Sequence, residues 1–279
     1  MLGGIRGLYD GTGLVRLGHR CMNGIVDGWI VNSRATVQSI VTHIGADPRK
    51  VFVVCNGIDP KAFASSLSAP EAKRRLGIDP GCPVVSIFAV LRPEKNHRLF
   101  LETAANVVNA LPLTRFLVAG DGKGRPALET CARALGIADR VLFLGNRTDV
   151  PDLLAATDVS MLTSHYEGLP NALLEAMAVA KPIVCTAFDG VEELVSDGRD
   201  GLIAPLGDGE GLASRVIALL QDESMRRRLG ENGLRTVTER FSLAALGRNL
   251  MTVYDGCLGR ATVTRDVQRG PQYSGDPVP

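Results

Sequence analysis

Residues 159–178 read VSMLTSHYEGLPNALLEAMA, and this stretch predicts a β-strand, a short loop and an α-helix in succession. The run Val159–Leu162 is short and apolar, as in a strand that is buried in a sheet. Pro170 is preset for a first helical turn, so we expect a helix over Asn171–Val179. Gly168, in the loop between them, lets the backbone approach a ligand closely.

The same alternation of strand and helix continues on both sides of this unit. The further strands are expected at Val84–Val90, Arg115–Ala119, Val141–Leu144, Pro182–Cys185 and Leu202–Ala204. The further helices are expected at His97–Asn109, Pro126–Leu135, Val150–Ala156 and Gly190–Val195. This order predicts an α/β fold with a Rossmann-like parallel sheet and helices on both faces. Ligands of such sheets bind at the carboxyl ends of the strands.

Further elements are expected on either side of this block. Before it, two strands and a helix (Trp29–Val31, Val51–Val54 and Ser33–Ile44) precede a linker at Asn56–Pro70 and indicate the remnant of a second Rossmann domain. After it, helices are expected at Asp208–Leu220, Glu223–Gly230, Glu231–Arg240 and Leu243–Asp255. We therefore divide the chain into a remnant with linker (1–66), a Rossmann-like domain (67–240), a final helix (241–258) and a disordered tail (259–279).

Composition excludes several classes of protein. With 31 Lys and Arg against 30 Asp and Glu, the net charge is +1, so no global field favours nucleic acid. The longest apolar run, Val84–Leu91, is far shorter than the roughly 20 residues that span a bilayer. The N-terminus lacks the apolar core of a signal peptide, which makes the cytoplasm the default location. No His or Cys cluster indicates a metal site.

Two carboxylates accompany the expected helix start in an E-x7-E spacing. The free amides near Asn171 and Ala172 form an anion site, where a phosphate can dock. Glu167 lies in the loop and Glu175 just over one turn into the helix, so both can flank such a ligand and hold sugar hydroxyls. The alternative stays open that Glu167 caps the helix and Glu175 is a solvated residue favoured by the helix dipole.

The E-x7-E spacing with its intervening Gly-Leu-Pro-Asn resembles the signature of the large retaining glycosyltransferase family with two Rossmann domains, the GT-B type. This family includes sucrose-phosphate synthase-like and lipopolysaccharide mannosyltransferase-like enzymes. The resemblance runs in order from about Asp27 to Asp255, through residues 27–33, 50–59, 88–96, 116–125 and 141–147. It implies that the chain carries the nucleotide-sugar-binding half of such an enzyme.

The resemblance also implies roles for individual residues. Arg92 and Lys95 correspond to the diphosphate-binding cations, and both suit a leaving group that gains negative charge without a metal. Glu175 is implied on the ribose and Glu167 near the donor sugar. The other implied donor contacts are Gly168, Leu169, Pro170, Asn171, Ala172, Arg147 and Glu193. Near Glu193 the sequence departs from the family's Gly-Gly-x-Pro-Glu pattern, because Asp189 and Glu192 stand where Gly and Pro are common.

The implied reaction moves a sugar from a nucleotide-sugar to an acceptor with retention, with a glycan or lipid-linked saccharide as the family-level acceptor and no cofactor. Peripheral membrane association is compatible with such an acceptor. Only about sixty residues precede the linker, whereas the family's acceptor domain has roughly 150 to 200. An N-terminally truncated chain, a separate partner chain, or a non-catalytic donor-binding module are the alternatives. A nicotinamide dehydrogenase is disfavoured, because Arg125 stands at the last position of G-x-G-x-x-G.

Overall fold

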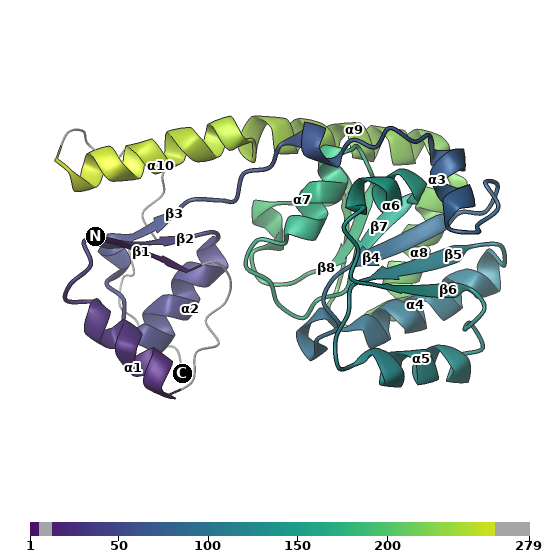
Figure 1. Cartoon of the computed structure of the whole chain (residues 1–279), viewed down its shortest axis with the longest axis horizontal. Helices are drawn as coiled ribbons and strands as arrows, with labels where there is room; N and C mark the ends of the chain where they lie inside the picture. Colours follow the sequence, from purple (N-terminus) through teal and green to yellow (C-terminus); the bar gives the residue numbers. More distant parts are fainter. Residues whose placement is uncertain (6–12, 260–279) are drawn as a thin grey trace. The chain divides into compact units, whose positions relative to one another are not determined.

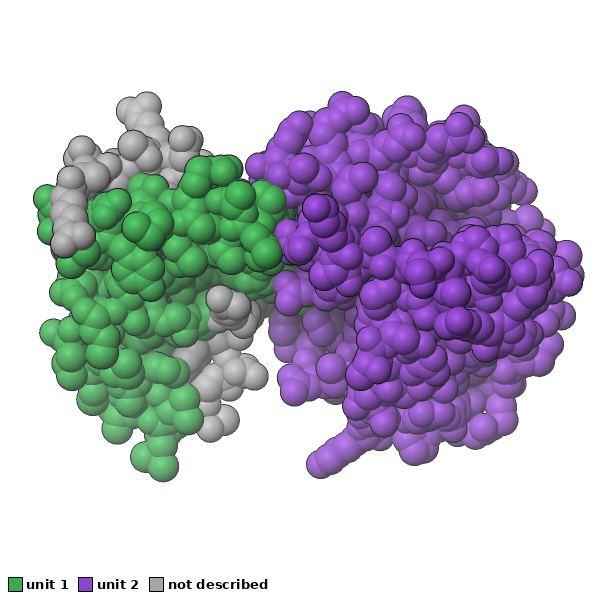
Figure 2. Space-filling view, turned by 45° about the horizontal axis from the view of Figure 1, so that its top comes forward, with its two compact units in different colours: residues 1–57, 167–169, 241–279 green, residues 58–166, 170–240 purple. Residues whose placement is uncertain are grey.

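A computed structural model describes residues 1–5 and 13–259 of the chain. Contacts between Cα atoms divide it into two compact units (Figure 2). The larger unit contains residues 58–166 and 170–240, and the smaller unit contains the described residues of 1–57, 167–169 and 241–279. The tail expected at 259–279 lies, except for Gly259, outside the described residues.

The larger unit contains a six-stranded parallel sheet in the order β6-β5-β4-β7-β8-β9. The strands are β4 (Val84–Phe88), β5 (Arg115–Ala119), β6 (Val141–Gly145), β7 (Val159–Leu162), β8 (Ile183–Thr186) and β9 (Leu202–Ala204). Counted along the chain, the spatial order is third, second, first, fourth, fifth and sixth, which is the Rossmann order. The predicted fold class is confirmed, and the strand order reverses between β4 and β7.

Helices cover both faces of this sheet (Figure 1). One face carries α4 (His97–Ala110), α5 (Arg125–Ala134) and α8 (Gly209–Gln221), and the other carries α3 (Ala69–Arg75), α6 (Val150–Ala156), α7 (Asn171–Ala178) and α9 (Glu223–Arg240). Phe100 of α4 and Phe116 of β5 are fully buried, with ring centroids 5.9 Å apart in an edge-to-face contact. Such a pair fixes the helix against the sheet.

The smaller unit contains a three-stranded parallel sheet with β2 (Gly28–Val31) between β1 (Leu2–Ile5) and β3 (Val51–Val53). Its helices are α1 (Gly13–Met22), α2 (Arg34–Ile44) and α10 (Leu243–Cys257). Val253 of α10 is buried with Phe52 and Val54, so this helix packs on the small sheet. Neither β1 nor α1 was expected from the glycine-rich N-terminus. No helix in the described ranges is long and apolar enough to cross a membrane.

Three expected helices differ from the structure by more than their bounds. The helix expected at Gly190–Val195 is only a short 3-10 turn, Val191–Glu193. Beyond this turn the backbone N–H of Ser196 donates to the Asp200 carboxylate at 2.6 Å and does not continue a helix. The two helices expected at Glu223–Gly230 and Glu231–Arg240 form one continuous helix, α9.

Gly230 explains why α9 is continuous. A Cβ atom on Gly230 would lie 2.0 Å from the carbonyl oxygen of Ala180, which follows α7. The glycine therefore lets α9 approach the end of α7, and this packing outweighs the low helix propensity of glycine. Such a tertiary contact between α9 and the end of α7 cannot be predicted from a local sequence pattern.

We expect Gly230→Ala to lower the free energy of unfolding by about 1–3 kcal/mol, because the added methyl group forces α9 away from Ala180. The matched control is Gly247→Ala in α10, where a Cβ meets nothing within 4 Å. That control should raise stability by roughly 0.5–1 kcal/mol. Urea unfolding followed by circular dichroism measures both, and equal stability of the two variants would contradict the close packing of α7 and α9.

Candidate functional site

The site lies where the strand order of the larger sheet reverses. After β4 the chain enters α4 on one face, and after β7 it enters α7 on the other. Sheets of this kind bind their ligands at such a switch point, at the carboxyl ends of the strands. Hydrogen bonds join the loop after β4 to the loop after β7. The backbone N–H of His165 donates to the carbonyl of Glu94 at 2.9 Å, and the Thr163 hydroxyl donates to the carbonyls of Lys95 and Asn96, both at 3.0 Å.

The strand order places most of the sequence-predicted residues along this edge. Arg147 follows β6, Arg92 and Lys95 follow β4, Asn171 follows β7 and Glu193 follows β8. Neighbouring parallel strands are about 4.8 Å apart, so the row from β6 to β8 spans about 19 Å. Glu167, Gly168 and Leu169 group with the smaller unit, so the site in the larger unit is built from the residues on either side of them.

The start of α7 offers an anion site. Pro170 is the N-cap residue, and no side chain caps the helix. The first N–H groups of a helix have no partner within it and carry the positive end of the helix dipole. Asn171 is exposed and Ala172 is half-buried, so solvent reaches this helix start. A phosphate group is a suitable ligand for such a helix end.

Glu175 is a half-buried carboxylate in the second turn of α7. Its carboxylate has no hydrogen bond or ion pair with any residue in the ranges 1–5 and 13–259. Burial raises its pKa above the usual value for glutamate. A desolvated carboxylate without a protein partner is typical of a binding site, where ligand hydroxyl groups supply the missing donors. Glu167, by contrast, is 8% exposed and already has a protein contact.

The raised pKa of Glu175 has consequences for pH dependence. The ionised form accepts hydrogen bonds from a ligand, so we expect affinity for a nucleotide-sugar to fall as the pH is lowered through this pKa. The stability of the ligand-free protein should change in the opposite direction, because a raised carboxyl pKa contributes stability at low pH that is lost as the pH rises. Calorimetric titration of the nucleotide-sugar from pH 8 to pH 5 tests the effect on affinity. A Glu175→Gln variant with the same pH profile would contradict it.

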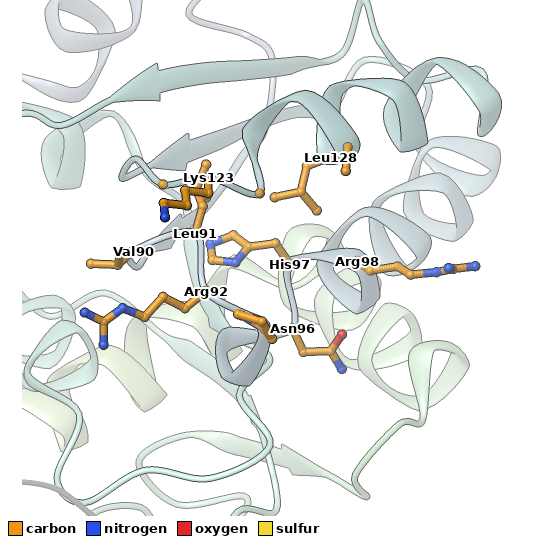
Figure 3. Close-up of a pocket in the computed structure, with 12 residues that line it drawn as sticks. Val90, Leu91, Arg92, Asn96, His97, Arg98, Lys123 and Leu128 are labelled. Atoms are coloured by element: carbon orange, nitrogen blue, oxygen red, sulfur yellow. The ribbon is translucent and has the colours of Figure 1, made fainter. Parts of the chain in front are cut away.

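The two expected cations lie in different parts of the β4 loop. The backbone of Lys95 is bonded to the start of the β7 loop through Thr163. Arg92 is 65% exposed, lies 3.8 Å from the Glu94 carboxylate, and lines a cavity with Lys123 on the β5 side of the loop (Figure 3). Of the two residues, Lys95 is therefore the better placed to contact an anion at the start of α7.

The two outer candidates are engaged in protein contacts. The guanidinium of Arg147 binds the carboxylate of Asp149 at 2.7 Å, and this hydrogen bond lowers the pKa of Asp149. The backbone carbonyl of Glu193 accepts a hydrogen bond from Arg240 at 2.6 Å. A nucleotide that binds beside Arg147 must therefore either form hydrogen bonds with the backbone of this loop or separate the Arg147 guanidinium from the Asp149 carboxylate.

The glycine-rich loop after β5 has a structural explanation. Gly120 has a φ of +146°, and a Cβ on it would lie 2.0 Å from the carbonyl oxygen of Ala89. A Cβ on Gly122 would lie 2.7 Å from the carbonyl oxygen of Leu91. These glycines let the β5 loop pack against the β4 loop, which favours the tight-turn interpretation over a dinucleotide site. Within the described part of the chain, no cluster of His, Cys, Asp or Glu could hold a metal ion.

Comparisons with known proteins identify the family and the fold of the chain. The family model "Glycosyl transferases group 1" matches residues 68–236. The lipopolysaccharide core biosynthesis mannosyltransferase LpsB of Rhizobium meliloti is 32% identical over 215 residues, which are 74% of this chain and 61% of that protein. The alpha-D-kanosaminyltransferase of Streptomyces kanamyceticus is 32% identical over 66% of this chain and 48% of its own length. The chain thus spans about half to three fifths of the curated relatives that it matches.

Two solved structures show the same fold. The Anabaena protein HepE in complex with UDP-glucose superposes with a TM-score of 0.79 at 25% identity, and the match covers 86% of this chain and 67% of that one. The C-terminal domain of the group 1 protein LpcC from Francisella tularensis superposes with a TM-score of 0.61 at 24% identity. That match covers 67% of this chain and 100% of the LpcC domain.

Proposed function

Because the chain belongs to the family of glycosyl transferases group 1, we propose that it binds a nucleoside-diphosphate sugar at the carboxyl ends of β4 and β7. The observation that carries the proposal is Glu175, a half-buried carboxylate without a protein partner, next to the uncapped start of α7. A helix start for phosphate and a carboxylate for hydroxyl groups together match the diphosphate and ribose of such a donor.

The proposed roles follow from this arrangement. The start of α7 and Lys95 hold the diphosphate, with Arg92 as a second cation. Glu175 accepts hydrogen bonds from the ribose, and Glu167 lies near the donor sugar. Gly168 to Ala172 supply backbone contacts, while Arg147 and Glu193 bound the site at its two ends. When the bond between the sugar and the diphosphate breaks, the leaving group takes the electron pair, and the fixed cations stabilise its growing charge.

We further propose that the sugar passes to an acceptor hydroxyl with retention, as a reaction of the whole enzyme. HepE was solved with UDP-glucose, which makes UDP-sugars the first donors to test, and LpsB acts in lipopolysaccharide core biosynthesis. A glycan or lipid-linked saccharide is therefore the proposed acceptor class. In the proposed division, residues 67–240 are the donor-binding domain. The acceptor-binding half of the enzyme is then supplied by further residues of the same protein or by a partner chain.

A thermal-shift panel tests the donor proposal. We expect UDP, GDP or ADP, alone or as the nucleotide-sugar, to raise the melting temperature, because a ligand that binds only the folded state stabilises it. NAD should have no such effect, since the β5 glycine loop serves packing. A shift with NAD and none with any nucleoside diphosphate would favour the dehydrogenase class. Donor binding without sugar release or transfer would identify a binding module instead.

A further inference from the structure

The cavity that Arg92 and Lys123 line lies on the β5 side of the β4 loop (Figure 3). Its volume is about 740 Å³, within the range of sites that hold small molecules. The loops after β4 and β5 and the first turns of α4 and α5 line it. Glu175 and the start of α7 do not line it, and Arg92 is the one residue that it shares with the proposed diphosphate contacts.

His97, the first residue of α4, lines this cavity with a ring that is 97% buried, since only 3% of the residue is exposed. Neither ring nitrogen meets hydrogen-bond geometry with any group in the described parts of the chain. Burial lowers the pKa of His97 to about 4, an effect that the backbone of Ala89 offsets only in part. The ring is therefore neutral at pH 7, with one donor and one acceptor that the protein leaves unsatisfied.

The opposite wall of the cavity favours an anion. Helix α5 begins at Arg125, and no side chain caps it. The Arg125 N–H donates to the carbonyl of Gly122 at 3.1 Å and Pro126 has no N–H, so the N–H of Ala127 is the backbone donor that this first turn offers to a ligand. The exposed Lys123 precedes this helix start and also lines the cavity. The acidic residue of the loop, Asp121, accepts the N–H of Gly122 at 2.8 Å and is not part of the lining. A positive helix end and an ammonium group together bind phosphate.

Beside the polar Asn96 and Arg98, the cavity has an apolar surface that includes Leu91, Ala127 and Leu128. Figure 3 shows the His97 ring pointing from α4 toward Leu91 of the β4 loop and Lys123 of the β5 loop, whereas Arg98 points away. The cavity thus combines an anion site, an apolar surface and a neutral imidazole. We propose that it binds a phosphomonoester with a compact apolar body, at a site separate from that of the nucleotide-sugar.

In the proposed complex the phosphate lies at the start of α5 against Lys123, and the apolar body lies on Leu91 and Leu128. The His97 nitrogens are shielded in this structure, so the ring must turn for one of them to reach a ligand oxygen. In this turn the ring gives up a contact with the Ala89 backbone that falls short of hydrogen-bond geometry. The adjacent cavity gives the ring room to move.

Phenyl phosphate is the minimal probe that carries both features, and inorganic phosphate and phenol each carry one. We expect phenyl phosphate to bind the full chain at millimolar concentration or below, and more tightly than either single-feature probe. The imidazole nitrogen resonances of His97 should shift on binding. The chain has only four histidines, so comparison with His97→Phe assigns these resonances. UDP should leave this binding unchanged.

Variants decide where the probe binds. Lys123→Ala and Ala127→Glu change exposed residues at the anion site, and each should weaken phenyl phosphate about tenfold or more. Lys61→Ala removes an exposed lysine elsewhere and should have no effect. Glu175→Gln should also leave the probe's affinity unchanged. Displacement by UDP, sensitivity to Glu175→Gln, or no binding at all would overturn the proposal.

Discussion

An Arg92→Ala/Lys95→Ala double variant is expected to bind UDP about 10²–10³-fold more weakly than the wild type, because two charge-assisted contacts with the diphosphate are lost. The β4 loop itself should keep its shape, since its bonds to the β7 loop use the backbone carbonyls of Glu94, Lys95 and Asn96. Isothermal titration calorimetry measures the affinity, and circular dichroism checks the fold.

The single variants separate the two cations. Lys95 is joined to the start of the β7 loop, whereas Arg92 lines the cavity on the other side. Lys95→Ala should therefore account for the larger share of the loss. A Lys61→Ala/Arg133→Ala variant removes the same charge from exposed positions and should bind UDP as the wild type does. Wild-type affinity in the Arg92→Ala/Lys95→Ala variant would count against the diphosphate assignment.

Glu175→Gln should change binding and stability in opposite directions. The affinity for UDP-glucose is expected to fall about tenfold or more, since hydrogen bonds to a charged acceptor contribute roughly 1.5–3 kcal/mol. The melting temperature of the ligand-free protein at pH 7 should rise, because the variant no longer buries a charge without a partner. Thermal unfolding and calorimetry on the same samples measure both effects.

Glu210→Gln is the matched control for this variant, because Glu210 is an exposed acidic residue in the first turn of α8. There the substitution should leave donor affinity unchanged and lower stability slightly, through the helix dipole. If Glu175→Gln behaved in the same way, Glu175 would be an ordinary helix residue, as the alternative interpretation of the sequence holds.

The fold was largely predictable from sequence, because buried parallel strands and amphipathic helices leave periodic patterns. The strand expected at Arg115–Ala119 and the helix expected at Val150–Ala156 have the bounds that the structure shows. The failures have a common cause in tertiary contacts. Gly230 indicated a break between helices, but in the structure it allows α9 to pack on Ala180. After the short turn that follows Gly190, the Ser196 N–H donates to the Asp200 carboxylate and does not continue a helix.

The site was predictable in its residue types and less so in its environment. The spacing of Glu167 and Glu175 indicated two carboxylates near one helix start, yet only the structure shows that Glu175 is desolvated without a partner. The burial of His97 depends on how α4 packs against the β4 and β5 loops, which no local pattern contains. Sequence reasoning therefore gave no reason to single out the cavity beside it.

A crystal structure of the chain soaked with UDP tests the central claim most directly. The expected difference density places the diphosphate at the start of α7 beside Lys95, with the ribose hydroxyl groups on the Glu175 carboxylate. Density for UDP elsewhere on the molecule, or an ordered α7 start without nucleotide at saturating UDP, would contradict the proposed donor site.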